Sequence, residues 1–227
     1  MRTRAAADDV AIPVGSDTIH GDLHVPPHAV GLAIFAHGSG SSRFSPRNLR
    51  VAHALEGEGL ATLLLDLLTA EEEAVDEVTG GYRFDIERLG HRVSAAVDWA
   101  RLQPELAELA IGCFGASTGA AAALVAAAQR PVSVAAVVSR GGRPDLAGNA
   151  LAHVEAPTLL IVGGLDQEVI ELNRRAMRQI QAPVRLEIIP GATHLFEEPG
   201  ALDAVARLAA DWFRRHLEAA SAGDALP

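Results

Sequence analysis

A serine in a glycine-flanked pentapeptide is the first candidate for chemistry. The segment Gly115-Ala116-Ser117-Thr118-Gly119 matches G-x-S-x-G, the sharp strand-to-helix turn that raises a serine hydroxyl above a sheet. Glycines suit such a turn because larger side chains would clash with the helix and the neighbouring strand. The alternative is a turn whose glycines serve only tight packing. The apolar strand before the motif and the alanine-rich helix after it favour a nucleophile.

A serine nucleophile needs a base, and the base needs an orienting acid. His194 and Asp166 are the candidates, and each follows a different predicted strand. The chain order Ser117, Asp166, His194 is the one expected of this strand-turn-helix architecture. The alternatives are a structural loop histidine for His194 and a helix cap for Asp166. Asp66 is a rival acid, although it precedes the serine.

Two backbone amides must stabilise the oxyanion of the tetrahedral intermediate. The first is that of Thr118, directly after the nucleophile and at the positive end of the following helix. The second is expected in the loop His37-Gly38-Ser39-Gly40, where Ser39 is favoured over Gly38. His37 is expected to brace this loop.

The elements that position these residues alternate between strands and helices. Two short strands joined at a Gly-Ser-Asp turn predict an N-terminal hairpin, and apolar runs of five to seven residues predict buried parallel strands. The predicted strands cover residues 10–14, 18–25, 31–36, 60–65, 109–114, 132–138, 158–162 and 184–189. The predicted helices cover residues 46–58, 85–102, 117–129, 168–180 and 201–217.

This alternation predicts an α/β fold with a mostly parallel, twisted sheet, helices on both faces and an N-terminal antiparallel hairpin. The loops after the parallel strands meet at one sheet edge, where ligands bind. Residues 1–217 are expected to form a single domain, residues 218–227 a disordered tail, and the acidic segment 71–81 a solvated loop.

Together, the His37-Gly38-Ser39-Gly40 loop, the serine pentapeptide, Gly164-Leu165-Asp166 and Gly191-Ala192-Thr193-His194 resemble the α/β-hydrolase superfamily. In its small size the chain resembles the lidless, dienelactone-hydrolase-like branch of that superfamily. The resemblance covers nearly the whole chain. It implies hydrolysis of an ester, lactone or related acyl group with no metal or organic cofactor. Authentic dienelactone hydrolases resemble this chain in fold but use a cysteine nucleophile, whereas this chain has Ser117, which argues against dienelactone itself as substrate.

Only residues 139–156 separate two predicted strands where many relatives insert a lid. This segment is too short for a helical cap domain, so we expect an open site for small substrates. Arg140 and Arg143 lie in it, and Arg43 follows the oxyanion loop. These three arginines are candidates for gripping a substrate carboxylate. The alternative is a surface role or an ion pair with the acidic segment 71–77.

Composition excludes several other classes of protein. With 19 basic and 29 acidic residues, the net charge of −10 argues against nucleic acid or an anionic membrane as partner. The chain has no lysine, which excludes Schiff-base chemistry, and its single cysteine, Cys113, is expected in the core. His20, His24 and His28 are spaced too far apart on a strand to share a metal ion.

The sequence also leads to expectations about where the protein is located and what it binds. Residues 110–128 are apolar but split into a strand and a helix, so no membrane span is expected. The first 14 residues have no secretory signal pattern, which favours the cytoplasm. The expected partner is a small ester-type molecule, and the oligomeric state is left open between a monomer and a homodimer.

The sequence thus predicts a serine hydrolase that cleaves small carboxylic esters or lactones through an acyl-enzyme intermediate. A thioesterase, an amidase or an acyltransferase would need no other residues. A non-catalytic binding protein of the same fold is the remaining alternative.

Overall fold

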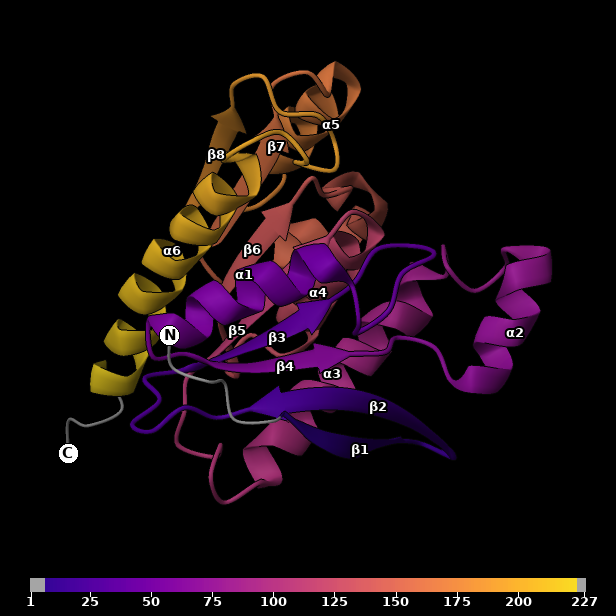
Figure 1. Cartoon of the computed structure of the whole chain (residues 1–227), viewed down its shortest axis with the longest axis vertical. Coiled ribbons are helices and arrows are strands. Elements are labelled where there is room, and N and C mark those ends of the chain that lie inside the picture. Colours follow the sequence, from indigo (N-terminus) through magenta and orange to yellow (C-terminus); the bar gives the residue numbers. More distant parts are fainter. Residues whose placement is uncertain (1–6, 224–227) are drawn as a thin grey trace.

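A computed structural model of the chain describes residues 7–223. One eight-stranded sheet runs through it in the order β1-β2-β4-β3-β5-β6-β7-β8 (Figure 1). The first two strands pair antiparallel as the predicted hairpin, β2 pairs antiparallel with β4, and all remaining neighbours are parallel. The strands are β1 (Asp8–Val14), β2 (Asp17–His24), β3 (Leu32–Ala36), β4 (Ala61–Leu65), β5 (Ile111–Ala116), β6 (Val134–Arg140), β7 (Thr158–Gly163) and β8 (Val184–Ile189).

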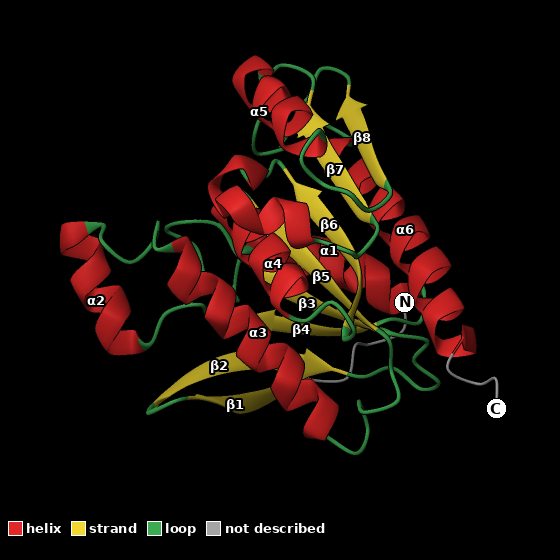
Figure 2. Ribbon diagram, turned by 180° about the vertical axis from the view of Figure 1, so that it is seen from behind, coloured by secondary structure: helices red, strands yellow, loops and turns green. Residues whose placement is uncertain are grey.

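Helices cover both faces of this sheet, as predicted. The helices are α1 (Pro46–Gly57), α2 (Ala70–Thr79), α3 (Ile86–Leu102), α4 (Thr118–Gln129), α5 (Gln167–Met177) and α6 (Ala201–Gly223), with a 3-10 segment η1 (Pro144–His153). Figure 1 shows α1 and α6 on one face, and Figure 2 shows α3 and α4 on the other. A separate apolar core fills the space under each layer, so the central strands are buried on both sides.

The local signals that start α1 behave as the sequence predicts. Ser45 is the N-cap, and its hydroxyl accepts a hydrogen bond of 3.4 Å from the amide of Asn48. Pro46 holds the first helical position, where its missing N–H costs nothing. This cap directs the N-terminal end of α1 to the edge of the sheet where the parallel strands end.

The prediction of a solvated loop over residues 71–81 is wrong, because most of this segment forms α2. Thr69 and Glu72 make a capping box: each side chain accepts a hydrogen bond from the other residue's amide. Acidic residues in the first turn also favour the helix through its dipole. Gly80 ends the helix with φ 64°. The helix projects from one edge of the molecule (Figure 1).

The C-terminal helix corrects a second expectation. Because α6 runs to Gly223, residues 218–223 are helical rather than a disordered tail, and residues 224–227 lie outside the described part of the chain. Residues 110–128 divide into β5 and nearly all of α4, as expected. Within residues 7–223, none of the helices combines the length and the apolar composition that a membrane span requires.

Candidate active site

The turn between β5 and α4 holds Ser117 in a strained backbone conformation, with φ 51° and ψ −120°. Both flanking glycines are required by close packing. A Cβ on Gly115 would lie 2.3 Å from Cα of Ala120, and one on Gly119 would lie 2.3 Å from the carbonyl oxygen of Ala36. Tight packing and exposure of the serine therefore come from the same turn, which has the geometry of a nucleophile elbow.

His194 and Asp166 meet beside this turn. Their loops follow β8 and β7, and Nδ1 of the imidazole lies 2.7 Å from Oδ2 of the carboxylate. An Nδ1–H that donates to the carboxylate leaves Nε2 as a proton acceptor. The carboxylate is mostly buried and the imidazole is more accessible, with side-chain exposures of 17% and 39%. This pair has the arrangement of a base and its orienting acid.

Ser117 and His194 line one cavity of about 260 Å³. In the part of the chain that the structure describes, no hydrogen bond joins the two side chains. Such bonds often become short and aligned only when substrate is bound. The loop after β3 also lines this cavity, so the candidate nucleophile, the candidate base and the predicted oxyanion loop surround a common space.

The two predicted oxyanion residues contact each other. Thr118 is the first residue of α4, where a helical N–H has no acceptor within the helix. The amide of Ser39 donates a hydrogen bond of 2.8 Å to Oγ1 of Thr118. The Ser39 amide therefore lies beside the first residue of α4 but already has an acceptor.

His37 braces the oxyanion loop, as predicted. Nδ1 of its buried ring lies 2.9 Å from the carbonyl oxygen of Gly38. Nε2 accepts a hydrogen bond of 3.1 Å from the amide of Leu67. Burial lowers the pKa of His37, although the Gly38 carbonyl and the charge of Asp66 act in the opposite direction. A neutral ring with its proton on Nδ1 satisfies both hydrogen bonds.

Arg43 does not reach the serine cavity. Its guanidinium lies 2.8 Å from Asp9 and 3.4 Å from both Asp22 and Asp66, on the side of the hairpin β1–β2. Its amide also donates to Asp66 at 2.9 Å. The prediction of Arg43 as a substrate ligand is thus not supported, and the rival acid Asp66 contacts Arg43 instead of the candidate base.

Arg143 also has a partner, since its guanidinium makes two hydrogen bonds to Asp145, at 2.9 and 2.8 Å. Of the three predicted arginines, only Arg140 lines the cavity of Ser117 and His194. Sequence reasoning missed Arg47 and Asn48, which line the same cavity. The signal was present: the Ser45-Pro46 cap puts both residues in the first turn of a helix that starts at this sheet edge.

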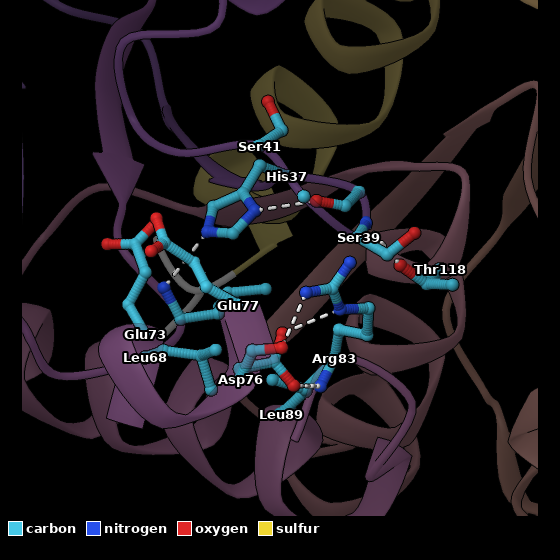
Figure 3. Close-up of a pocket in the computed structure, with 13 residues that line it drawn as sticks. His37, Ser39, Ser41, Leu68, Glu73, Asp76, Glu77, Arg83, Leu89 and Thr118 are labelled. Atoms are coloured by element: carbon cyan, nitrogen blue, oxygen red, sulfur yellow. Dashed lines mark hydrogen bonds and ion pairs between the residues drawn. The ribbon is translucent and has the colours of Figure 1, made fainter. Parts of the chain in front are cut away.

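A second cavity, also of about 260 Å³, lies on the other side of the oxyanion loop (Figure 3). Leu67, Leu68 and Leu89 supply apolar walls, and α2 supplies acidic side chains. Figure 3 shows Asp76 and Arg83 joined at its lower side. Burial raises the pKa of the Asp76 carboxyl, but hydrogen bonds from Arg83 and Tyr82 outweigh burial and hold that pKa below its ordinary value.

Comparisons with known proteins agree with this geometry. The family model described as "Dienelactone hydrolase family" matches residues 36–221. A crystal structure of a dienelactone hydrolase from Anabaena variabilis ATCC 29413 is 57% identical and has a TM-score of 0.91, covering 94% of this chain and 100% of that one. Est1E from Butyrivibrio proteoclasticus, at 17% identity and a TM-score of 0.76 over 92% of this chain and 98% of its own, shares the fold.

Curated relatives include a longer protein. A putative phosphoribosyl transferase of Mycobacterium tuberculosis (strain ATCC 25618 / H37Rv) is 56% identical over 210 residues, which cover 92% of this chain and 46% of the relative. This chain therefore spans about half the length of that relative. An uncharacterized protein of the same strain is 30% identical over 220 residues, covering 84% of this chain and 72% of that protein.

Proposed function

The chain belongs to the dienelactone hydrolase family, and from that premise we propose that it hydrolyses small carboxylic esters or lactones through a serine nucleophile. One observation carries the proposal: strained Ser117 opens into the same cavity as His194, whose Nδ1 lies 2.7 Å from Asp166. Nucleophile, base and orienting acid come from three different loops, at the sheet edge where α/β folds bind ligands.

The first half of the reaction forms an acyl-enzyme. Oγ of Ser117 attacks the substrate carbonyl carbon while Nε2 of His194 accepts the hydroxyl proton. Asp166 keeps the imidazole in the required tautomer and stabilises the imidazolium that forms. The tetrahedral intermediate then breaks its bond to the leaving oxygen, and His194 gives that oxygen the proton. In a lactone, the freed alcohol stays attached to the acyl group.

The second half releases the acid. A water molecule gives a proton to His194 and attacks the acyl carbonyl, and the bond to Ser117 breaks as the proton returns to Oγ. Every group in this scheme is a side chain or backbone amide of the chain or a water molecule.

The oxyanion is held by the amides of Thr118 and Ser39. The Thr118 amide lies at the N-terminal end of α4, whose dipole favours a negative charge. The Ser39 amide shares its N–H between Oγ1 of Thr118, which keeps it in position, and the developing oxyanion, as in a three-centre hydrogen bond. A donor of this kind contributes about 3 to 4 kcal/mol to the transition state.

The surroundings of the cavity favour small substrates. The segment between β6 and β7 holds only η1, which packs against α4, and it forms no cap over Ser117. Substrate contacts are thus restricted to the sheet-edge loops and the first turn of α1.

The test is steady-state hydrolysis of 4-nitrophenyl acetate and of a small lactone, with the matched thioester and amide in parallel. Ester or lactone turnover that disappears in Ser117→Ala supports the proposal. Turnover that persists in folded Ser117→Ala excludes the nucleophile. Preference for the thioester or amide would overturn the ester assignment while leaving the catalytic residues in place.

A further inference from the structure

Arg140 is a buried cation with no matching anion among residues 7–223. It ends β6 in the cavity beside Ser117, and only 6% of the residue is exposed. Its Nη2 donates to Oδ1 of Asn48 at 3.3 Å, whereas its buried Nε has no hydrogen-bond partner in the described part of the chain. No carboxylate among the described residues forms an ion pair with it. Burial, and then the charge of Arg47, lowers the pKa of Arg140 to about 10.

A second guanidinium, that of Arg47, lines the same cavity, and its positive charge is only weakly balanced by a carboxylate. Arg47 lies in the first turn of α1, and its buried Nε also lacks a hydrogen-bond partner among the residues that the structure describes. Its ion pair with Glu197 is long, at 3.5 Å, and that glutamate is 66% exposed, so solvent weakens the attraction. Two like charges thus share a partly buried space, which is unfavourable unless an anion joins them.

The N-terminal end of α1 faces this space as well. Ser45, Arg47 and Asn48, the cap and two residues of the first turn, all line the cavity. Helix N-termini attract anions through unpaired N–H groups and the helix dipole. The helix end, two arginines and an asparagine side chain therefore surround one small cavity beside the nucleophile.

We propose that this cavity binds a phosphate monoester group carried by the substrate, so that the enzyme acts on phosphorylated small esters. The inference rests on the proposed hydrolase function and adds its substrate class. The phosphate is held and not cleaved: the bond that breaks is the acyl C–O bond attacked by Ser117.

Charge and geometry favour phosphate over a carboxylate. A phosphate monoester carries a charge between about −1.5 and −2 at pH 7, which matches two guanidinium groups, whereas a carboxylate carries only one. It also presents three acceptor oxygens, and arginine forks bind such oxygens in pairs. The two guanidinium groups come from different elements, Arg47 on α1 and Arg140 on β6, and separate oxygens of one phosphate can accept from both.

The first test measures binding without turnover. Inorganic phosphate is titrated into the protein by isothermal calorimetry, with acetate as the carboxylate probe. We expect phosphate to bind at least about tenfold tighter than acetate, and Arg140→Met and Arg47→Met each to weaken phosphate binding at least tenfold. Arg130→Met is the matched control, because Arg130 is an exposed arginine paired with Asp98. Equal binding of both anions, or binding unaffected by either variant, overturns the proposal.

The second test measures selectivity with three activated esters of equal chain length. Their acyl chains end in a phosphate, a carboxylate or a methyl group, and 4-nitrophenol is the common leaving group. We expect the phosphate-ended ester to have the highest kcat/KM of the three. In Arg47→Met, the ratio of this kcat/KM to that of the methyl-ended ester should fall at least tenfold. Arg47 is the position tested because its side chain is more exposed than that of Arg140.

The two proposals fail in different ways. Hydrolysis of the methyl-ended ester as fast as the phosphate-ended one overturns the phosphate site and leaves the hydrolase standing. Tight phosphate binding with no ester hydrolysis overturns the hydrolase and retains the anion site.

Discussion

Ser39 and Thr118 are 79 residues apart in the chain, yet the amide of Ser39 donates a hydrogen bond of 2.8 Å to the hydroxyl of Thr118. The two residues proposed to form the oxyanion hole thus hold each other in place before substrate arrives. Preorganised donors lower the barrier because they need no reorganisation during the reaction. The Thr118 side chain is therefore a positioning group for the amide of Ser39.

Thr118→Val tests this role. Valine keeps the shape of threonine but cannot accept the Ser39 amide, so the oxyanion loop loses an anchor. We expect kcat to fall about tenfold or more with little change in KM, because a small displacement of an oxyanion donor acts on the transition state. Thr118→Ser keeps the hydroxyl and should retain most of the activity. An unchanged kcat in Thr118→Val would show that this contact has no part in catalysis.

Asp166→Asn tests the orienting acid. The amide keeps the size of the carboxylate but favours the wrong imidazole tautomer and cannot stabilise the imidazolium. We expect kcat to fall by about 10³ to 10⁴. Asp66→Asn is the control, because Asp66 contacts Arg43 rather than His194. If Asp66→Asn were the more damaging of the two, the assignment of the acid would be reversed.

His37 should make stability depend on pH. Burial lowers its pKa in the folded state below the ordinary value of 6.5, so the unfolded chain binds a proton more readily. The contribution of neutral His37 to the free energy of unfolding is therefore fully present above pH 6.5. Below pH 6.5 it declines by up to about 1.4 kcal/mol per pH unit. Urea unfolding between pH 7.5 and 5 should show a shallower decline in His37→Gln than in the wild type. Parallel profiles would contradict a buried neutral His37.

Arg140→Met should separate stability from function. An unpaired buried charge destabilises the fold, and methionine fills a similar volume without that charge. We expect the free energy of unfolding to rise by about 1 to 3 kcal/mol in urea denaturation. Arg130→Met should show no such gain, because Arg130 is exposed and paired. A large loss of stability in Arg140→Met would mean that the guanidinium supports the fold.

The sheet was predictable because buried parallel strands leave short apolar runs. The runs at β3, β5 and β7 have every residue buried, and the Ser45-Pro46 cap marked the start of α1. Cys113 lies fully buried in β5, as expected, and burial raises the pKa of its thiol to about 12. These features depend on local pattern, which sequence carries directly.

The features that the sequence did not predict are helix α2 and the partners of individual side chains. The acidic composition of residues 71–81 predicts a loop, but the Thr69–Glu72 capping box starts helix α2 there. Arg43, Arg140 and Arg143 are equivalent as residue types, and only their neighbours separate them. Arg43 and Arg143 form ion pairs with carboxylates, whereas Arg140 lies in the cavity with no such pair to any residue between 7 and 223. The contact between Ser39 and Thr118 left no trace in local sequence.

The central claim is that Ser117 is an activated nucleophile. The most direct measurement is intact mass after treatment with a fluorophosphonate probe, comparing the wild type with Ser117→Ala and confirming by circular dichroism that both are folded. The account predicts a single adduct on the wild type and none on the variant. No adduct on folded wild type, or an equal adduct on Ser117→Ala, would contradict it.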